Sequence, residues 1–195
     1  MELQHINIKI FAAKHDGVTL QPAAGVFHRW IQSGDFTEEL LLDVADYAHV
    51  PAGPGIMLIG HEAFYGLEFG AENRLGLLYN QRTRVEGTNK ERISLALRRA
   101  IRAAKRLESE PEYKGKLTFQ LNDALIVAND RLLVPNQPAS FEALRDDIEG
   151  ALSSVSGGGS AKLEYEQGDG RSRFQVRLKI AVPTPLHELA SASGS

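Results

Sequence analysis

Hydrophobic residues alternate with polar ones in short stretches along the chain, which is the pattern of β-strands that bury one face. Residues 6–10 place three isoleucines on one side, and residues 174–180 place four apolar residues on one side. The run 56–59 is apolar without alternation and has glycines on both sides, so we expect a central strand that is covered on both faces. Further strands are predicted at residues 40–47, 64–69, 75–80, 116–121, 124–128 and 162–166.

Three other stretches repeat their apolar residues with the period of an α-helix. The first follows Pro22 and the third follows Ser140, residue types that favour the start of a helix. The second begins with a capping box, because Thr88 can accept from the amide of Glu91 while the Glu91 carboxylate reaches back to Thr88. The sequence therefore predicts amphipathic helices near residues 22–31, 88–108 and 140–152.

Together these elements predict an α+β protein with a mostly antiparallel sheet of about eight or nine strands and three amphipathic helices. Residues 5–69 and 116–181 share the order strand, helix, strand pair, which suggests two similar βαββ-type lobes. We expect an N-terminal lobe over residues 1–110, a C-terminal lobe over 111–182 and a mobile tail over 183–195. The alternative to two lobes is one compact domain.

The composition is that of a soluble globular protein, since 43% of the 195 residues are hydrophobic, 24% are charged and the formal net charge is -3. The absence of cysteine excludes disulfides, thiolate zinc sites and a cysteine nucleophile, and it fits a reducing compartment. The N-terminus lacks the pattern of a signal peptide, and no apolar run reaches the ~18 residues of a membrane span. We therefore expect a cytoplasmic protein that does not enter a membrane.

Titratable residues gather around the predicted central strand. Asp46 and His49 close the strand before it, and His61 and Glu62 follow it. Two imidazoles and a carboxylate can form a metal site with open positions, so His49, His61 and Asp46 are candidate metal ligands. His61, Glu62 and Asp46 are also candidate catalytic residues for acid–base chemistry. The alternative is that these groups only form hydrogen bonds at the strand ends. No helical H-E-x-x-H, nucleophile elbow, P-loop or dinucleotide fingerprint accompanies them, so the sequence names no cofactor.

Basic residues recur along the predicted helix 88–108, on the side opposite to its apolar stripe. Residues 88–110 contain seven Lys or Arg against three Glu. We expect Arg92, Arg99, Arg102 and Arg106 to contact an acidic protein surface or a second copy of the chain. The alternative is a solvated face without a partner. Nucleic acid is not expected as a partner, because the sequence pI is about 6.1 and no exposed aromatic residues accompany the arginines.

Two functions are compatible with these patterns. The first is a soluble, non-enzymatic binding or assembly protein that uses a sheet face or the charged helix to engage a protein partner or itself, as a homo-oligomer. The second is a small metal-dependent or His/carboxylate hydrolase-like enzyme built on residues 43–62. The sequence leaves open whether the protein is an enzyme and whether it binds a small molecule.

Overall fold

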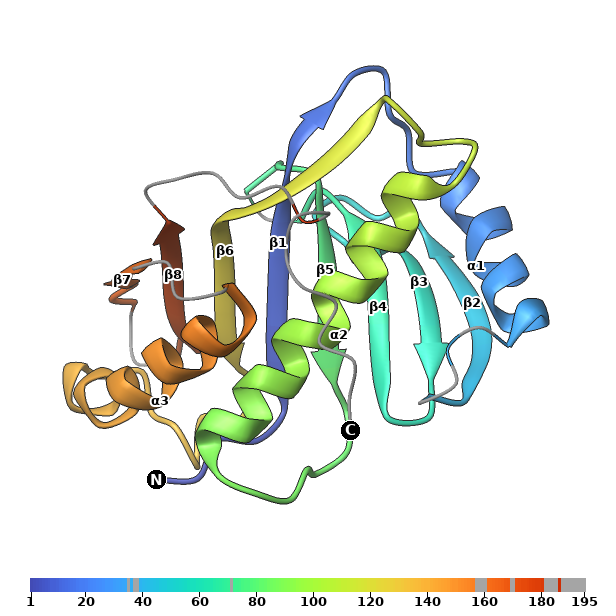
Figure 1. Cartoon of the computed structure of the whole chain (residues 1–195). Helices are drawn as coiled ribbons and strands as arrows, with labels where there is room; N and C mark the ends of the chain where they lie inside the picture. Colours follow the sequence, from blue (N-terminus) through green and yellow to red (C-terminus); the bar gives the residue numbers. More distant parts are fainter. Residues whose placement is uncertain are drawn as a thin grey trace.

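Three helices lie on one side of an antiparallel sheet in the computed structural model of the chain, which describes residues 1–34, 36, 39–70, 72–156, 161–168, 171–180 and 186 (Figure 1). The helices are α1 (Pro22–Ser33), α2 (Asn89–Ser109) and α3 (Pro138–Ser156). The strands are β1 (Ile6–His15), β2 (Leu41–Tyr47), β3 (Gly55–Gly60), β4 (Ala63–Glu68), β5 (Gly76–Gln81), β6 (Leu117–Ala128), β7 (Ala161–Tyr165) and β8 (Phe174–Ile180). This architecture confirms the predicted α+β class.

The eight strands of the described part form one sheet in the order β2-β3-β4-β5-β1-β6-β8-β7, and every neighbouring pair is antiparallel. The first strand of the chain therefore lies in the interior of the sheet, between β5 and β6. The two-lobe βαββ arrangement is not confirmed, and the division at residue 110 stays a prediction. The predicted mobile tail, 183–195, lies outside the described residues apart from Leu186, whose side chain is buried in the core.

One strand, β6, replaces the two strands predicted at residues 116–121 and 124–128. The chain does not turn at Asn122 and Asp123, because the segments on both sides of them pair with β1. Shifts in register after Ile10 and after Ala12 allow the twelve residues of β6 to follow the ten of β1.

The core lies between the sheet and the helices. Helix α2 packs across β1, β5 and β6, α1 packs on β2 and β3, and α3 contacts α2 and β7. Five buried aromatic rings continue from α1 into the sheet, with neighbouring centroids 5.1 to 5.8 Å apart: Phe27, Trp30, Phe36, Tyr65 and Tyr79. Offset and edge contacts of this kind add to the stability that apolar burial provides.

On the opposite face of the sheet, side chains over β1, β6 and β8 pack on one another. Phe11, Leu125 and Val127 form a small buried cluster there, and the Arg74 guanidinium lies 3.9 Å from the centroid of the Phe11 ring. A buried ion pair joins Lys9 and Glu68 on the same face, with Nζ 2.7 Å from Oε1. Further ion pairs fix the charged side chains above this cluster, among them Glu72, Asp123, Glu166, Arg177 and Lys179. Over β1, β6 and β8, this face therefore presents charged groups and not an apolar surface.

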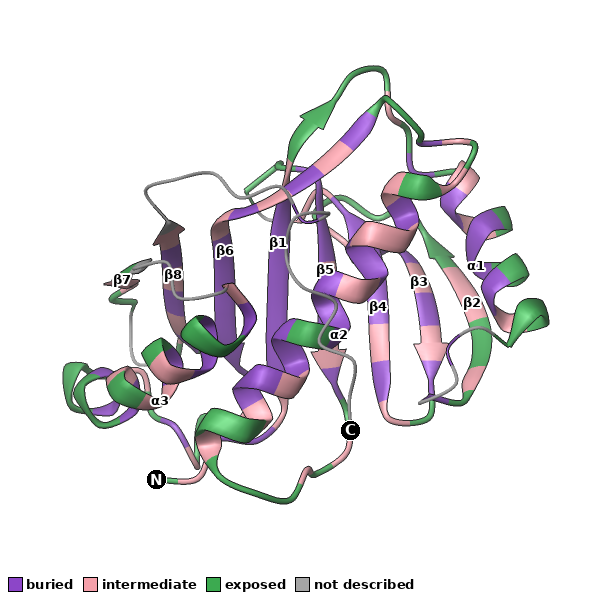
Figure 2. Ribbon diagram, in the orientation of Figure 1, coloured by how far each residue is buried: buried purple, intermediate pink, exposed green. Residues whose placement is uncertain are grey.

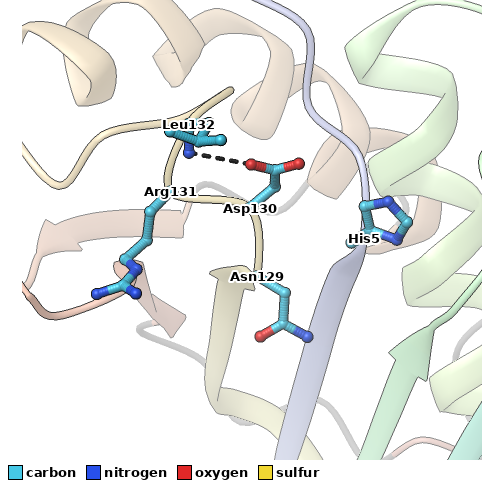
Figure 3. A pocket seen from close by; sticks show the side chains of 5 residues that line it. All are labelled: His5, Asn129, Asp130, Arg131 and Leu132. Atoms are coloured by element: carbon cyan, nitrogen blue, oxygen red, sulfur yellow. Dashed lines mark hydrogen bonds between the residues drawn. The ribbon is translucent and has the colours of Figure 1, made fainter.

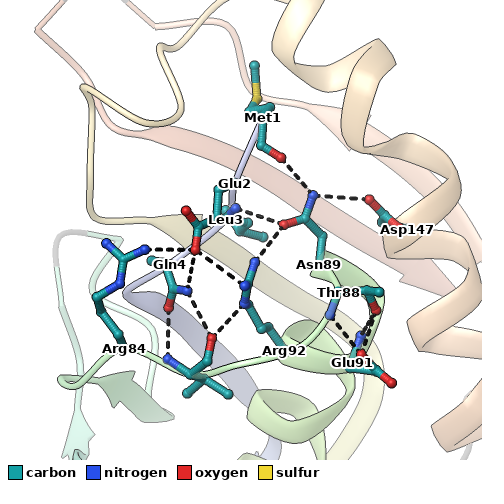
Figure 4. A network of polar contacts seen from close by, with 11 residues as sticks. Met1, Glu2, Leu3, Gln4, Arg84, Thr88, Asn89, Glu91, Arg92 and Asp147 are labelled. Atoms are coloured by element: carbon teal, nitrogen blue, oxygen red, sulfur yellow. Dashed lines mark hydrogen bonds and ion pairs between the residues drawn. The ribbon is translucent and has the colours of Figure 1, made fainter.

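The N-terminal segment is fastened to the start of α2 by side-chain hydrogen bonds (Figure 4). The Asn89 side chain accepts from the amide of Leu3 at 2.8 Å and donates to Asp147 of α3 at 3.2 Å. Thr88 and Glu91 form both hydrogen bonds of the predicted capping box, which confirms the start of α2. In the described part of the chain, no helix has the length and apolar character needed to cross a membrane.

Candidate functional site

Strand β2 forms one edge of the sheet and, within the described residues, pairs only with β3. A strand in this position leaves a row of backbone N–H and C=O groups without sheet partners, and such a row can template the addition of another strand. Figure 2 shows that exposed and half-buried residues make up β2, whereas its neighbour β3 is largely buried. We refer to the surface formed by residues 40–50 as the β2 edge.

Exposed apolar side chains gather on the β2 edge. Six large hydrophobic residues are exposed in the described part of the chain, and four of them lie here: Leu40 (65% exposed), Leu42 (49%), Tyr47 (44%) and Val50 (40%). The other two, Met1 and Leu132, lie elsewhere on the surface. Single exposed apolar residues are ordinary, but a group of them along an edge strand is typical of an interaction site.

Free backbone groups on β2 can be assigned from one hydrogen bond. The N–H of Val44 donates to the Oδ1 atom of Asp43 at 2.8 Å, so it does not bond to β3 and points to the free side of the strand. Backbone groups of alternate residues point to the same side of an antiparallel strand, so Asp46 also presents its N–H and C=O groups outward. An added strand could bond to both residues.

A hollow of about 410 Å³ adjoins the N-terminal end of β2. Its lining combines aromatic and aliphatic side chains with one carboxylate: Trp30, Ile31, Gly34, Phe36, Glu39, Leu40 and Leu41. A hollow of this size and composition can accept a single apolar side chain from a segment that lies along β2.

A buried ion network forms the wall of the sheet next to this hollow. The Glu39 side chain is 1% exposed, accepts a hydrogen bond from the Tyr65 hydroxyl, and has its Oε1 atom 3.0 Å from Nη1 of Arg99. Nη2 of Arg99 also donates to Oε2 of Glu62 at 2.8 Å. The network fastens α2 to β4, to the β3–β4 turn and to the residue that precedes the β2 edge.

The phenols of this network are donors at neutral pH. Burial, reinforced by the charge of Glu39, raises the pKa of Tyr65 far above its usual range. Burial also raises the pKa of Tyr79 to about 12, although the nearby Arg99 acts in the opposite direction. Burial of Arg99 favours its neutral form, but its bond to Tyr79 and the charge of Glu39 give a net rise in its pKa. A permanently charged arginine that neutralises a buried glutamate is a structural arrangement, not one poised for proton transfer.

The predicted metal ligands are not brought together. Antiparallel pairing of β2 with β3 joins Tyr47 to Gly55 at one end and Leu41 to Gly60 at the other. His49 and Asp46 therefore lie at one end of the strand pair and His61 at the opposite end, roughly 15–20 Å apart at about 3.4 Å per residue. Among the described residues, no group of three or more His, Asp or Glu side chains is arranged to hold a metal ion.

The predicted catalytic residues are divided in the same way. His61 and Glu62 adjoin each other in the turn between β3 and β4, and Glu62 is held by Arg99. The Asp46 carboxylate is at the far end of β2, where it accepts from the amide of Ala48 at 2.9 Å and stabilises the turn.

The predicted partner-binding arginines contact their own chain instead of forming an open basic stripe. Arg99 is buried, Arg92 donates to the carbonyl of Val85 at 2.7 Å, and Arg102 and Arg106 lie over the ring of Phe36. Their side of α2 faces the β5–α2 connection and the aromatic core. The polar residues opposite the apolar stripe are therefore partly buried, which the helical period alone does not reveal.

A second hollow, of about 640 Å³, is lined by His5, Asn129, Asp130, Arg131 and Leu132 (Figure 3). Three of its residues form local hydrogen bonds. Asp130 accepts from the amide of Leu132 at 3.0 Å, Asn129 donates to Asn7 at 2.8 Å, and Arg131 donates to the carbonyl of Arg171 at 2.7 Å. These bonds fix the connection after β6 and engage the side chains of Asn129, Asp130 and Arg131 within the chain.

The fold and the β2 edge define the chain as an α+β protein whose antiparallel sheet ends in an edge strand with exposed apolar and acidic side chains. No protein-family model and no curated protein matches this chain.

Proposed function

We propose that this protein is a non-enzymatic binding or assembly protein that engages a protein partner, or a second copy of itself, by strand addition along the β2 edge. The observation that carries the proposal is the gathering of four exposed apolar side chains on and beside an edge strand, two within β2 and one next to each of its ends. The absence of cysteine in the sequence supports a cytoplasmic place of action.

Strand addition uses the features of this edge together. Outward backbone groups at Val44 and Asp46 provide hydrogen bonds that any extended chain can form, and the hollow beside Leu41 provides selectivity for a side chain. The four apolar side chains are about half exposed, and covering them contributes roughly 1 kcal/mol each to binding. This gain exceeds the cost of ordering the added strand only if the backbone hydrogen bonds also form.

The enzyme alternative has less support. It would have to rely on His61 and Glu62 without His49 or Asp46, which lie at the other end of the strand pair. Glu62 is already engaged by Arg99. No observation on the described residues favours a reaction at this turn.

The proposal is tested by making the edge charged. We expect the double variant Leu42→Lys with Tyr47→Lys to lose self-association, or binding of peptides selected from a display library on the wild-type protein, by tenfold or more, on the order of the loss of two apolar contacts. The matched control is Leu132→Lys, which places the same charge on an exposed apolar residue away from the edge. Sedimentation velocity and peptide titration measure the two arms. Equal behaviour of the double variant and the wild type would contradict the proposal.

A further inference from the structure

We infer that the β2 edge takes an extended segment of a partner protein that carries two basic residues three positions apart, in preference to a second copy of this chain. The inference rests on the function proposed above and names the chemistry of the partner. The inference is based on the positions of two carboxylates, Asp43 and Asp46, within the edge strand β2.

The two carboxylates lie on opposite faces of the sheet. Asp43 pairs with Ile59, which pairs in turn with Phe64 of β4, and both lie on the face away from the helices. Asp46 pairs with Ile56, which is buried in the core beneath the helices. Residues of an added strand opposite these two positions are also three apart, at roughly 10 Å, and also point to opposite faces. A basic residue at each position would face a carboxylate across the strands.

Neither carboxylate is neutralised within the described part of the chain. Each accepts only a backbone amide, from Val44 to Asp43 and from Ala48 to Asp46. Both residues are exposed, and residues 39–50 contain no Lys or Arg. A cation from a partner therefore meets no competing cation along this strand.

The same charges oppose pairing of β2 with β2 of a second copy. A two-fold axis at Asp46 would place the Asp46 carboxylates of the two copies opposite each other on one face, and an axis at Asp43 would do the same for Asp43. Other registers keep four carboxylates within one short strand pair that has no basic residue. Like charges directly opposite each other destabilise a strand pair, whereas opposite charges stabilise it.

Asp43 has a further role in this arrangement. In the free protein its carboxylate satisfies the outward N–H of Val44. An added strand supplies a carbonyl to this N–H, which releases the Asp43 carboxylate to bond to the basic residue of the partner. The exchange leaves neither the amide nor the carboxylate without a partner.

The test uses capped eight-residue peptides that differ only in the position or sign of charge. The probe is Thr-Val-Lys-Val-Thr-Lys-Val-Thr, and its isomer Thr-Val-Lys-Val-Lys-Thr-Val-Thr has the lysines two apart, on one face. A third peptide replaces both lysines of the probe by glutamate. We expect the probe to bind roughly tenfold more tightly than its isomer and the glutamate peptide to bind most weakly, with the preference reduced by salt.

Variants of the protein assign the preference to the carboxylates. Asp43→Asn with Asp46→Asn keeps size and hydrogen-bonding ability, and we expect it to bind the probe and its isomer alike, while Asp130→Asn, on the connection after β6, keeps the wild-type preference. Thermal unfolding by circular dichroism verifies that each variant is folded.

The outcomes separate this inference from the proposed function. Equal binding of all three peptides that is lost in Leu42→Lys with Tyr47→Lys would overturn the inference and leave the function of the edge standing. Self-association through the β2 edge that no peptide displaces would have the same meaning. Absence of binding to every peptide, with no effect of the lysine variants on association, would overturn both.

Discussion

The two edges of the sheet differ in length, charge and exposed apolar surface. At one end, β7 has five residues, and its Lys162 and Glu164 side chains form a 3.0 Å ion pair while 75% and 41% exposed. At the other end, β2 has seven residues without a basic side chain and exposes Leu42 and Tyr47. Short strands and lysines are the usual means by which proteins prevent unwanted strand pairing. The chain applies them at β7 and not at β2.

The difference between the two edges supports a specific role for the β2 edge in binding. If both edges of the sheet exposed apolar side chains alike, the exposure of β2 would indicate only that the fold tolerates exposed edge strands. Here the ring of Tyr165 in β7 stacks on Phe141 of α3, and its hydroxyl donates to Asn136 at 2.6 Å. The large aromatic side chain of the β7 edge is therefore engaged within the molecule. The exposed side chains of β2 have no equivalent cover among the described residues, which favours cover by a partner.

The largest expected effect removes the support behind the β2 edge. Arg99→Ala leaves Glu39 buried without its cation, and we expect a loss of about 3–5 kcal/mol in the free energy of unfolding. Urea unfolding measures this loss. The matched control is Arg98→Ala, the exposed neighbour on α2, for which we expect a change within about 0.5 kcal/mol. A similar small change in both variants would show that the network does not stabilise this end of the sheet.

A second variant removes from β7 the charged side chains that we expect to prevent strand pairing at that edge. Lys162→Val with Glu164→Val removes both charges from β7, and we expect new concentration-dependent association in sedimentation velocity, because an apolar edge strand then lies at each end of the sheet. Lys162→Arg with Glu164→Asp is the control and keeps the wild-type state. If the valine variant stays unchanged, the charges of β7 are not what protects it.

The smallest expected effect concerns pH and the ion pairs on the sheet face away from the helices. Burial acts to raise the pKa of Asp123, but hydrogen bonds from Arg74, Lys179 and Arg177 lower it overall below the usual value of 3.8. Because the pKa is lower in the folded state, Asp123 stabilises the fold above about pH 4, and this contribution is lost as the pH falls through the folded-state value.

We therefore expect Asp123→Asn to lower stability at pH 7 and to approach the wild type as the pH falls below the folded-state value of Asp123. Urea midpoints across this range measure the difference. Asp16→Asn is the control, since its ion pair with Lys14 is exposed to solvent. A difference that stays constant with pH would contradict the role of the charge.

Local patterns in the sequence predict most of the elements. The alternation of residues 6–10 and the capping box at Thr88 each contain their whole signal within a few positions, and both are confirmed. The break assumed at Asn122 is wrong, because pairing of β6 with β1 overrides the turn preference of Asn and Asp.

The candidate site depends on information that is not local. The run of residues 40–47 resembles an ordinary strand, and only the order of the sheet reveals that it is an edge. The grouping of His49 with His61 follows proximity in sequence, but antiparallel pairing separates them by the length of a strand. Once the two edge strands are known, the sequence does distinguish them. Strand 161–165 carries a lysine, whereas β2 has no basic residue and places Leu42 and Tyr47 at its surface, which indicates β2 as the candidate binding edge.

The most direct test of the β2 edge is amide hydrogen exchange, followed by NMR, with and without the peptide that carries lysines three residues apart. We expect the N–H groups of Val44 and Asp46 to exchange roughly tenfold more slowly when the peptide is bound, since an added strand gives them backbone carbonyl partners. The N–H groups of Lys162 and Glu164 on β7 are expected to be unchanged. New protection on β7, or binding that leaves Val44 and Asp46 unaffected, would contradict strand addition at the β2 edge.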